Sequence, residues 1–242
     1  MSTFLLVHGA WHGGWCWRKI TPLLEARGHS VLAPDLPGHG DDKTSIETVT
    51  LGAYAGCICG MIGSQATPVI LVGHSMAGAV VTQAAENSPH NIAALVYLCA
   101  FLPRDGDSIM TWAQQDHENL VNPNILPLRD GLLGFRPEAL REAFYALCTD
   151  EDATYAQSRL VPQPGEPFVQ PVKASPERWG GIRRYYIESL QDRAVSPRIQ
   201  REMQKHSPCF QRFTVESDHS PFFSAPDQLA SILSQIADQL GK

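Results

Sequence analysis

Short apolar runs alternate with longer amphipathic segments over the first hundred residues of the chain. Turn-forming residues bound the runs, most clearly in PDLPGHG after the second one. Continuous apolar runs are typical of strands buried on both faces of a parallel sheet, and the segments between them suit crossing helices. We therefore expect strands at 3–7, 30–33, 68–72 and 92–99, and helices at 17–27, 51–62 and 76–87.

The alternation breaks at residue 103 and resumes at about residue 182. The intervening segment carries prolines, helical patches at 137–148 and 150–160, and an irregular stretch at 161–176. An insertion at this point of a parallel sheet is where a lid over a site would lie. We expect one α/β domain over residues 1–242, a mostly parallel sheet with helices on both faces. Its core is residues 1–102 and 182–242, and its inserted cap is 103–181. In the second part of the core we expect strands at 183–189 and 210–216 and helices at 197–205 and 226–240.

Composition narrows the class of partner. The 242 residues suffice for a sizeable core, and 43% hydrophobic with 18% charged residues is typical of a globular protein. The net charge of −6 argues against nucleic acid or an anionic membrane as a partner, since basic residues cluster only at Arg183 and Arg184. A homodimer is left open.

The location of the protein is predicted to be cytoplasmic. The first residues offer no basic segment before a long apolar run, and no stretch approaches the ~20 apolar residues of a membrane span. Six scattered cysteines show no zinc-like spacing, because Cys57 and Cys59 lack a second pair. We expect reduced thiols that mostly lie in the core, and no metal or cofactor.

The strongest chemical signal is the phrase VILVGHSMAG, in which an apolar strand runs into a helix through Ser75. A serine on a sharp strand-to-helix turn needs small neighbours, and Gly73 meets that need. The usual second glycine, two residues after the serine, is Ala77 here, with Gly78 one step further. The turn would present the Ser75 hydroxyl at the mouth of the sheet, where the Met76 N–H could stabilise an oxyanion.

A second element, HGAWHGGW, follows the first expected strand. An oxyanion hole needs two converging N–H donors, and this glycine-rich loop could supply the second, from Ala10. Taken alone, the loop could equally be a plain turn after a strand. Beside Ser75, the functional interpretation is favoured.

A serine needs a base, and in this type of fold the acid and then the histidine follow it along the chain. His219 fits, since it lies in a loop after the strand at 210–216. Asp192 fits as the acid, because it follows the strand at 183–189. Asp218 adjoins His219, but neighbouring side chains point apart. The other histidines are out of order, in the cap or on a helix: His8, His12, His29, His39, His74, His90, His117 and His206.

The chain resembles the α/β-hydrolase branch of hydroxynitrile lyases, plant methyl esterases and bacterial pyrethroid-type esterases. The likeness runs nearly end to end, through HGAWHGGWCW, VGHSMAG, RWGGIRRYYI, LQDRAVSP and DHSPFFSAP. It implies the same triad, an oxyanion hole at Ala10 and Met76, and a cap over an apolar pocket. Candidates for its lining are Trp112, Phe144 and Trp179, although each could equally be packing within the cap.

Two departures favour an esterase over a lyase. The lyases carry a lysine directly after the catalytic histidine and a threonine after the histidine of the first loop, where this chain has Ser220 and Gly9. We expect a serine carboxylesterase for small hydrophobic esters, including aryl-containing or pyrethroid-like ones, acting through an acyl-enzyme on Ser75. The alternatives are a lyase, an amide or carbon–carbon bond hydrolase with the same triad, and a ligand-binding receptor on this fold.

Overall fold

The structure, a computed structural model, describes residues 1–241 and is built on a six-stranded sheet. Its strands lie in the order β2-β1-β3-β4-β8-β9, and every neighbouring pair is parallel. The expected sheet is therefore confirmed. The strands are β1 (Thr3–Val7), β2 (Ser30–Leu32), β3 (Val69–His74), β4 (Ile92–Leu98), β8 (Arg184–Ser189) and β9 (Gln211–Val215).

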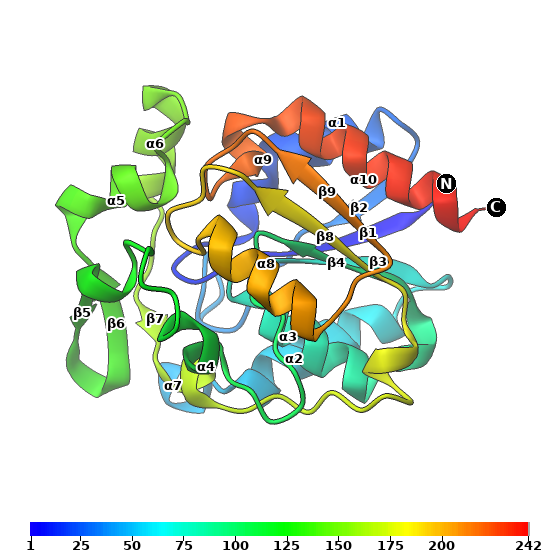
Figure 1. The fold of residues 1–242 in the computed structure, drawn as a ribbon, viewed down its shortest axis with the longest axis horizontal. Coiled ribbons are helices and arrows are strands. Elements are labelled where there is room, and N and C mark those ends of the chain that lie inside the picture. Colours follow the sequence, from blue (N-terminus) through cyan, green and yellow to red (C-terminus); the bar gives the residue numbers. More distant parts are fainter. Residues whose placement is uncertain (242) are drawn as a thin grey trace.

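Helices cover both faces of the sheet (Figure 1). One face carries α1 and α10, which contact each other, and the other carries α2, α3 and α8. Because both faces are covered, β3 is buried along its whole length, and its residues 69–72 form a continuous apolar run. These helices are α1 (Ile20–Glu25), α2 (Leu51–Gly63), α3 (Ala77–Asn87), α8 (Pro197–His206) and α10 (Pro226–Leu240), with the short α9 (Pro221–Ser224) before α10.

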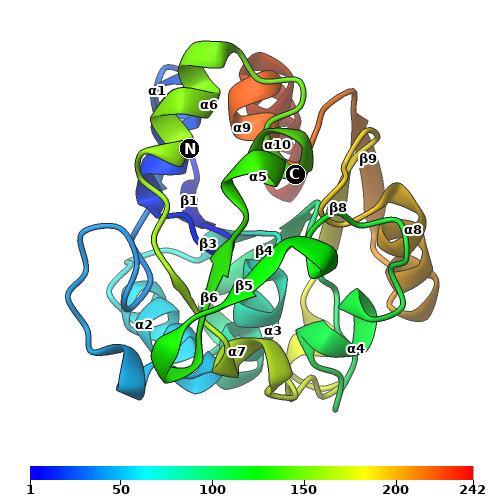
Figure 2. The ribbon, with the colours of Figure 1, turned by 90° about the vertical axis from the view of Figure 1, so that its left-hand side faces the viewer.

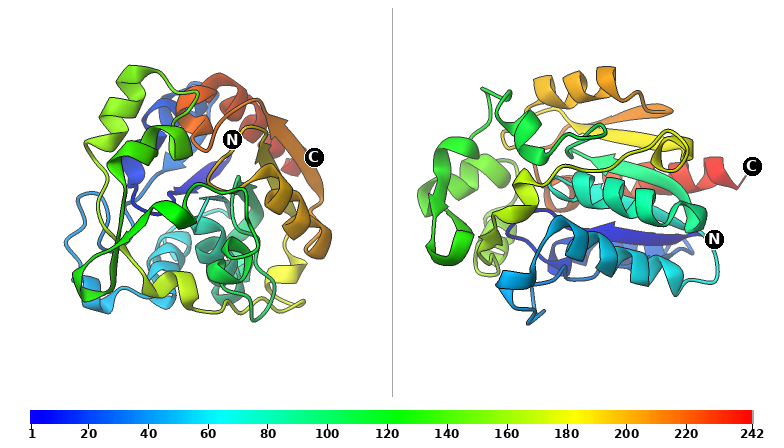
Figure 3. Two further views of the ribbon diagram at one scale, coloured as in Figure 1. Left: turned by 60° about the vertical axis from the view of Figure 1, so that its left-hand side comes forward. Right: turned by 90° about the horizontal axis from the view of Figure 1, so that it is seen from below.

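The segment between β4 and β8 lies at the end of the sheet toward which the strands point. Both termini lie at the opposite end (Figures 1 and 3). The carboxyl ends of the parallel strands are where such folds place their sites. We propose that this segment is the expected cap of residues 103–181, and that residues 1–102 and 182–242 form the core. Residue 242 lies outside the described residues.

The inserted segment has its own small antiparallel sheet, β5-β6-β7. Figure 2 shows β5 and β6 passing in front of the main sheet, with α5 and α6 to one side and α4 and α7 to the other. The sequence did not predict this sheet, because its strands are short and two of them contain proline. The elements are α4 (Ile109–Ala113), β5 (Ile125–Pro127), β6 (Leu132–Phe135), α5 (Pro137–Phe144), α6 (Asp150–Gln157), β7 (Gln163–Pro164) and α7 (Glu166–Val169).

The first expected helix, at 17–27, is divided in the structure. A 3-10 helix spans Gly14–Lys19, and α1 begins only at Ile20. Pro22 explains the division, since a proline fits only in the first turn of an α-helix.

None of the helices in residues 1–241 is long and apolar enough to span a membrane.

Two glycines allow the end of β3 to pack against its neighbours. A Cβ at Gly73 would lie 2.7 Å from the carbonyl oxygen of Ala77, and a Cβ at Gly78 would overlap the carbonyl oxygen of Phe101. Gly78 therefore permits the close approach of α3 to the chain leaving β4. This contact also explains why Ala77 can stand where a glycine is usual two residues after the serine. The position that has no room for a side chain is the next one, Gly78.

Replacing Gly78 by alanine should destabilise the fold, because the overlapping atom belongs to backbone and cannot swing aside. We expect Gly78→Ala to lower the free energy of unfolding by about 3 kcal/mol, measured by urea denaturation. The matched control is Gly56→Ala on the exposed side of α2, where no atom lies within 4 Å of the added Cβ. It should gain about 1 kcal/mol from helix propensity. Equal midpoints for the Gly78 variant and the wild type would contradict this account.

Candidate active site

Ser75 sits on a strained turn between β3 and α3. Its φ is +56°, a left-handed value that serine rarely adopts. The turn is held by three backbone bonds: the Ser75 N–H donates to the Leu98 carbonyl at 3.2 Å, and the Ser75 carbonyl accepts from the N–H groups of Gly78 and Phe101, both at 3.1 Å. Strain of this kind persists only where surrounding structure enforces it, and it is common at functional sites.

Asp192 and His219 form a buried pair beside this turn. Asp192 lies in the turn after β8 and His219 in the loop after β9, and His219 Nδ1 is 2.8 Å from Asp192 Oδ2. Both side chains are almost fully buried. The carboxylate accepts the Nδ1 proton, so Nε2 is left with a free lone pair. The sequence predicted this pairing.

Three further donors surround the Asp192 carboxylate. The N–H groups of Ala194 and Val195 donate to Oδ1 at 2.7 and 2.9 Å, and Gln200 Nε2 donates to Oδ2 at 3.2 Å. Burial raises the pKa of Asp192, and the His219 ring together with the backbone donors opposes that rise. The carboxylate is thus held in place by groups that also favour its charge.

His74 ties the serine turn to the loop of His219. Its Nε2 donates to the His219 carbonyl at 2.8 Å, and the two rings lie 4.6 Å apart between centroids. Ser75 Oγ and His219 Nε2 themselves have no hydrogen-bond partner among residues 1–241, so the third contact of a triad is not made here. Such contacts are often long without substrate and shorten in the complex.

His74, Cys99 and His219 bring three potential metal ligands within 4.8 Å of one another. The two histidines each keep one free ring nitrogen, but Cys99 does not suit a metal, because burial raises the pKa of its thiol and a protonated thiol is a poor ligand. His74 Nε2 and Cys99 Sγ both donate to the carbonyl of His219, and His219 Nδ1 donates to Asp192. Among the described residues no other such group is found.

Two backbone N–H groups stand free beside Ser75. Within residues 1–241, the N–H groups of Ala10 and Met76 donate no hydrogen bond, and both residues line the same cavity as Ser75. Gly9 allows the loop to come this close, because a Cβ at Gly9 would lie 2.9 Å from the Cβ of Ser75. The predicted pair of oxyanion donors is therefore placed at the cavity wall.

Two histidines fix the loop that carries Ala10. His8 donates through Nδ1 to the Gly9 carbonyl at 2.8 Å, and His12 donates through Nδ1 to the Ala10 carbonyl at 2.7 Å. His12 Nε2 then accepts from the hydroxyl of Tyr145, in the inserted segment, at 2.8 Å. Burial lowers the pKa of His12 to about 4, so its ring is neutral at pH 7.

Asp218 binds the inserted segment rather than His219. Its carboxylate accepts from the N–H of Leu147 at 2.7 Å, the N–H of Ser220 at 3.0 Å and the hydroxyl of Ser224 at 2.8 Å. Sequence reasoning set Asp218 aside as the acid without finding this second role. Nothing in the sequence signals it, because Leu147 is 71 residues away.

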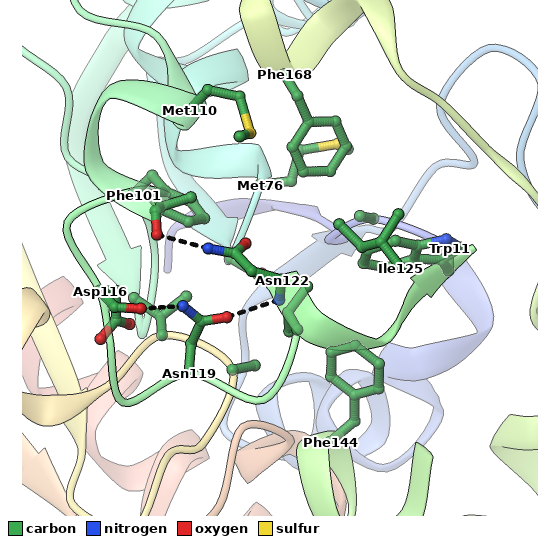
Figure 4. Close-up of a pocket in the computed structure, with 16 residues that line it drawn as sticks. Trp11, Met76, Phe101, Met110, Asp116, Asn119, Asn122, Ile125, Phe144 and Phe168 are labelled. Atoms are coloured by element: carbon green, nitrogen blue, oxygen red, sulfur yellow. Dashed lines mark hydrogen bonds between the residues drawn. The ribbon is translucent and has the colours of Figure 1, made fainter. Parts of the chain in front are cut away.

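The cavity beside Ser75 is narrow and mostly apolar. Its volume is about 30 Å³. Figure 4 shows aromatic and sulfur-containing side chains around it, with a polar wall on one side. The apolar lining includes Trp11, Met76, Phe101, Met110, Phe144 and Phe168.

Of the three predicted lining residues, the structure brings only Phe144 to the cavity. Trp112 lies on α4 but points away, with its indole N–H donating to Asp107 at 3.0 Å. Trp179 does not line the cavity either. Its indole N–H donates to the hydroxyl of Tyr97 at 2.8 Å, and the guanidinium group of Arg184 lies over its ring. Aromatic residue type did not distinguish lining from packing. The helical spacing of Met110 and Ala113, both in the lining, was the missed signal.

All six cysteines are free thiols, and Cys16, Cys99 and Cys148 are buried. Burial raises the pKa of each of these three. Cys57, Cys59 and Cys209 are only partly buried, so half of the thiols, not most of them, lie in the core. The reduced state stays a prediction. The cytoplasmic location stays a prediction.

The buried histidines predict acid sensitivity. A neutral His12 with a pKa of about 4 is protonated less readily folded than unfolded, where the pKa is 6.5. The contribution of the neutral His12 ring to the free energy of unfolding is therefore fully present above pH 6.5 and is lost as the pH drops toward 4. His12 alone should remove about 2 kcal/mol between pH 7.5 and 5. Urea denaturation at both values should show a smaller difference for His12→Gln than for the wild type. Replacing the exposed His117 by glutamine is the control, and an unchanged difference in the His12 variant would contradict the assignment.

Comparison with known proteins agrees with this geometry. The model of the alpha/beta hydrolase family matches residues 4–232. The chain is 34% identical to methylesterase 7 of Arabidopsis thaliana, over 98% of this chain and 96% of that protein, and 32% identical to the pyrethroid hydrolase of Sphingobium wenxiniae, over 98% and 88%. The crystal structure of a pyrethroid hydrolase from Sphingobium faniae covers 98% of this chain and 97% of its own, with a TM-score of 0.87 at 31% identity. The chain therefore belongs to the alpha/beta hydrolase family, in the branch of plant methylesterases and bacterial pyrethroid hydrolases.

Proposed function

We propose that the chain is a serine carboxylesterase that hydrolyses small hydrophobic esters through an acyl-enzyme on Ser75. The observation that carries the proposal is the buried Asp192–His219 pair beside a serine in a left-handed turn. A histidine held by a carboxylate can take a proton, and a strained serine at a cavity wall can attack a carbonyl. The relatives named as methylesterases and as a pyrethroid hydrolase support the same class of reaction.

The chemistry follows from the groups in place. Ser75 Oγ attacks the ester carbonyl carbon while His219 Nε2 takes its proton, and Asp192 stabilises the imidazolium that forms. His219 then protonates the leaving alcohol as the carbon–oxygen bond breaks. A water molecule repeats the sequence on the acyl-enzyme and releases the acid.

The negative charge of the tetrahedral intermediate needs donors that are ready before the reaction. The free N–H groups of Ala10 and Met76 suit this role, because they need not break another bond to donate. Met76 also precedes the first turn of α3, whose dipole favours an anion. The hydrogen bond from His12 to Ala10 fixes one of the two donors.

Cyanohydrin cleavage is the less favoured use of this site. Departing cyanide carries negative charge, and the position after His219 is Ser220, which is fully buried and whose hydroxyl has no hydrogen-bond partner within the described part of the chain. A threonine at Gly9 would press its Cβ against Ser75. Position 220 therefore supplies no cation beside the leaving group, and the contact at Gly9 leaves no room for the hydroxyl-bearing side chain found in the lyases.

Removal of the nucleophile or the base should abolish the activity. Ser75→Ala and His219→Ala should each lower kcat on p-nitrophenyl esters by roughly 10⁴-fold or more, and the double variant should lose little beyond either, since the groups act as one unit. Steady-state kinetics with purified protein measure this. Losses that multiply in the double variant would sink the assignment.

The two aspartates should separate cleanly. Asp192→Asn should lower kcat by roughly 10³–10⁴-fold, because an amide in place of the carboxylate favours the wrong imidazole tautomer. Asp218→Asn should cost far less kcat, and should act mainly on KM and on stability, through the contacts with Leu147 and Ser224. The reverse ranking of kcat would show that the wrong acid was chosen.

A further inference from the structure

The cavity has one polar wall, formed by the loop that follows α4. Asp116, Asn119 and Asn122 lie along it (Figure 4). The side chains of the first two are committed within the protein. Asp116 accepts from the N–H of Ser196 at 2.8 Å and from its hydroxyl, while Asn119 accepts from the N–H of Asn122 at 2.7 Å and donates to the Asp116 carbonyl.

In the side-chain amide of Asn122, only the nitrogen has a hydrogen-bond partner within residues 1–241. Its Nδ2 donates to the carbonyl of Ala113 at 2.7 Å. A carbonyl can only accept, so this bond fixes which end of the amide is nitrogen and leaves Oδ1 on the other side. Within residues 1–241, Oδ1 accepts no hydrogen bond.

No other lining group competes for this role. The indole N–H of Trp11 is bonded to the Leu133 carbonyl at 2.8 Å, and Ser75 Oγ is reserved for chemistry. Among the described side chains that line the cavity, Asn122 Oδ1 is therefore the one oxygen or nitrogen, apart from Ser75 Oγ, that lacks a partner. It is an acceptor held in a fixed direction on the polar wall of the cavity, and Asn122 as a whole is an exposed residue.

We propose that Asn122 Oδ1 selects esters that carry a hydrogen-bond donor, a hydroxyl or an N–H, on the group that occupies this cavity. The inference rests on the proposed esterase function and adds a requirement to it. A purely apolar ester would cover Oδ1 and leave it without a partner, which disfavours its binding and turnover. An ester with a donor at this position would supply Oδ1 with a hydrogen-bond partner.

The experiment uses matched esters of one shape. The probes are p-nitrophenyl esters of 3-phenylpropanoic acid that carry either a hydroxyl or a methyl group at position 3 or 4 of the ring. The measured quantity is the ratio of kcat/KM for the hydroxyl ester to that for the methyl ester, at the better ring position. In Asn122→Leu this ratio should fall by about 10-fold relative to the wild type.

Asn124→Leu is the matched control. Asn124 lies on the same 3-10 helix, Asn122–Asn124, and its Nδ2 also donates to a backbone carbonyl, that of Leu120, at 2.8 Å. It does not line the cavity. Its loss should leave the ratio at the wild-type value, so a general disturbance of the loop is separated from the loss of Oδ1.

The outcomes are distinct. Ester hydrolysis with the same ratio in the wild type and Asn122→Leu would overturn the role of Asn122 and leave the esterase standing, as would an equal fall in both variants. Absence of hydrolysis for every ester would overturn the proposed function. In that case calorimetric binding of the corresponding free hydroxyl and methyl acids to wild type and Asn122→Leu decides the donor preference, and equal affinity ratios would overturn it too.

Discussion

The close approach of backbone segments around Ser75 is the constraint on which the rest of the site depends. Gly9 lies against Ser75 from one side, and Gly78 lets the backbone at Phe101 bond to the Ser75 carbonyl from another. The left-handed turn at Ser75 exists only because these neighbours hold it. Once it is held, the free N–H groups of Ala10 and Met76 come to the same cavity as the hydroxyl. The packing of the backbone therefore requires glycine at positions 9 and 78, independently of the chemistry.

The inserted segment is bonded to both sides of this site. Tyr145 bonds to His12, which in turn holds the Ala10 carbonyl, while the N–H of Leu147 bonds to Asp218 beside His219. Phe144, next to these contacts, lines the cavity. A movement of this segment would thus shift the oxyanion donor at Ala10 and the base His219 together. The narrowness of the cavity makes such a movement relevant to the entry of a substrate.

Much of the fold could be predicted because the sheet is buried on both faces. Apolar runs then mark the strands directly, as in β3 and β4, and the comparisons confirm the expected fold and family. The order of Ser75, Asp192 and His219 along the chain also predicted which side chains would lie together at the ends of the strands. Their catalytic roles remain a proposal.

The cavity could not be predicted in the same way. Trp112 and Met110 lie two residues apart on α4, and only the rotation of that short helix decides which of them faces the cavity. The free oxygen of Asn122 depends on a hydrogen bond to Ala113, nine residues earlier, which no pattern announces. Strand periodicity is set by burial, whereas side-chain direction in an irregular segment is set by contacts distant in the sequence.

The most direct test of the central claim is the site of covalent labelling by an alkyl fluorophosphonate, located by mass spectrometry of peptides. The reagent reacts with a serine only when a base activates it and an oxyanion hole receives the phosphoryl oxygen. The account predicts one stoichiometric adduct on Ser75, formed far more slowly when His219 is alanine. An unlabelled Ser75, or an adduct on another residue that accompanies loss of activity, would contradict it.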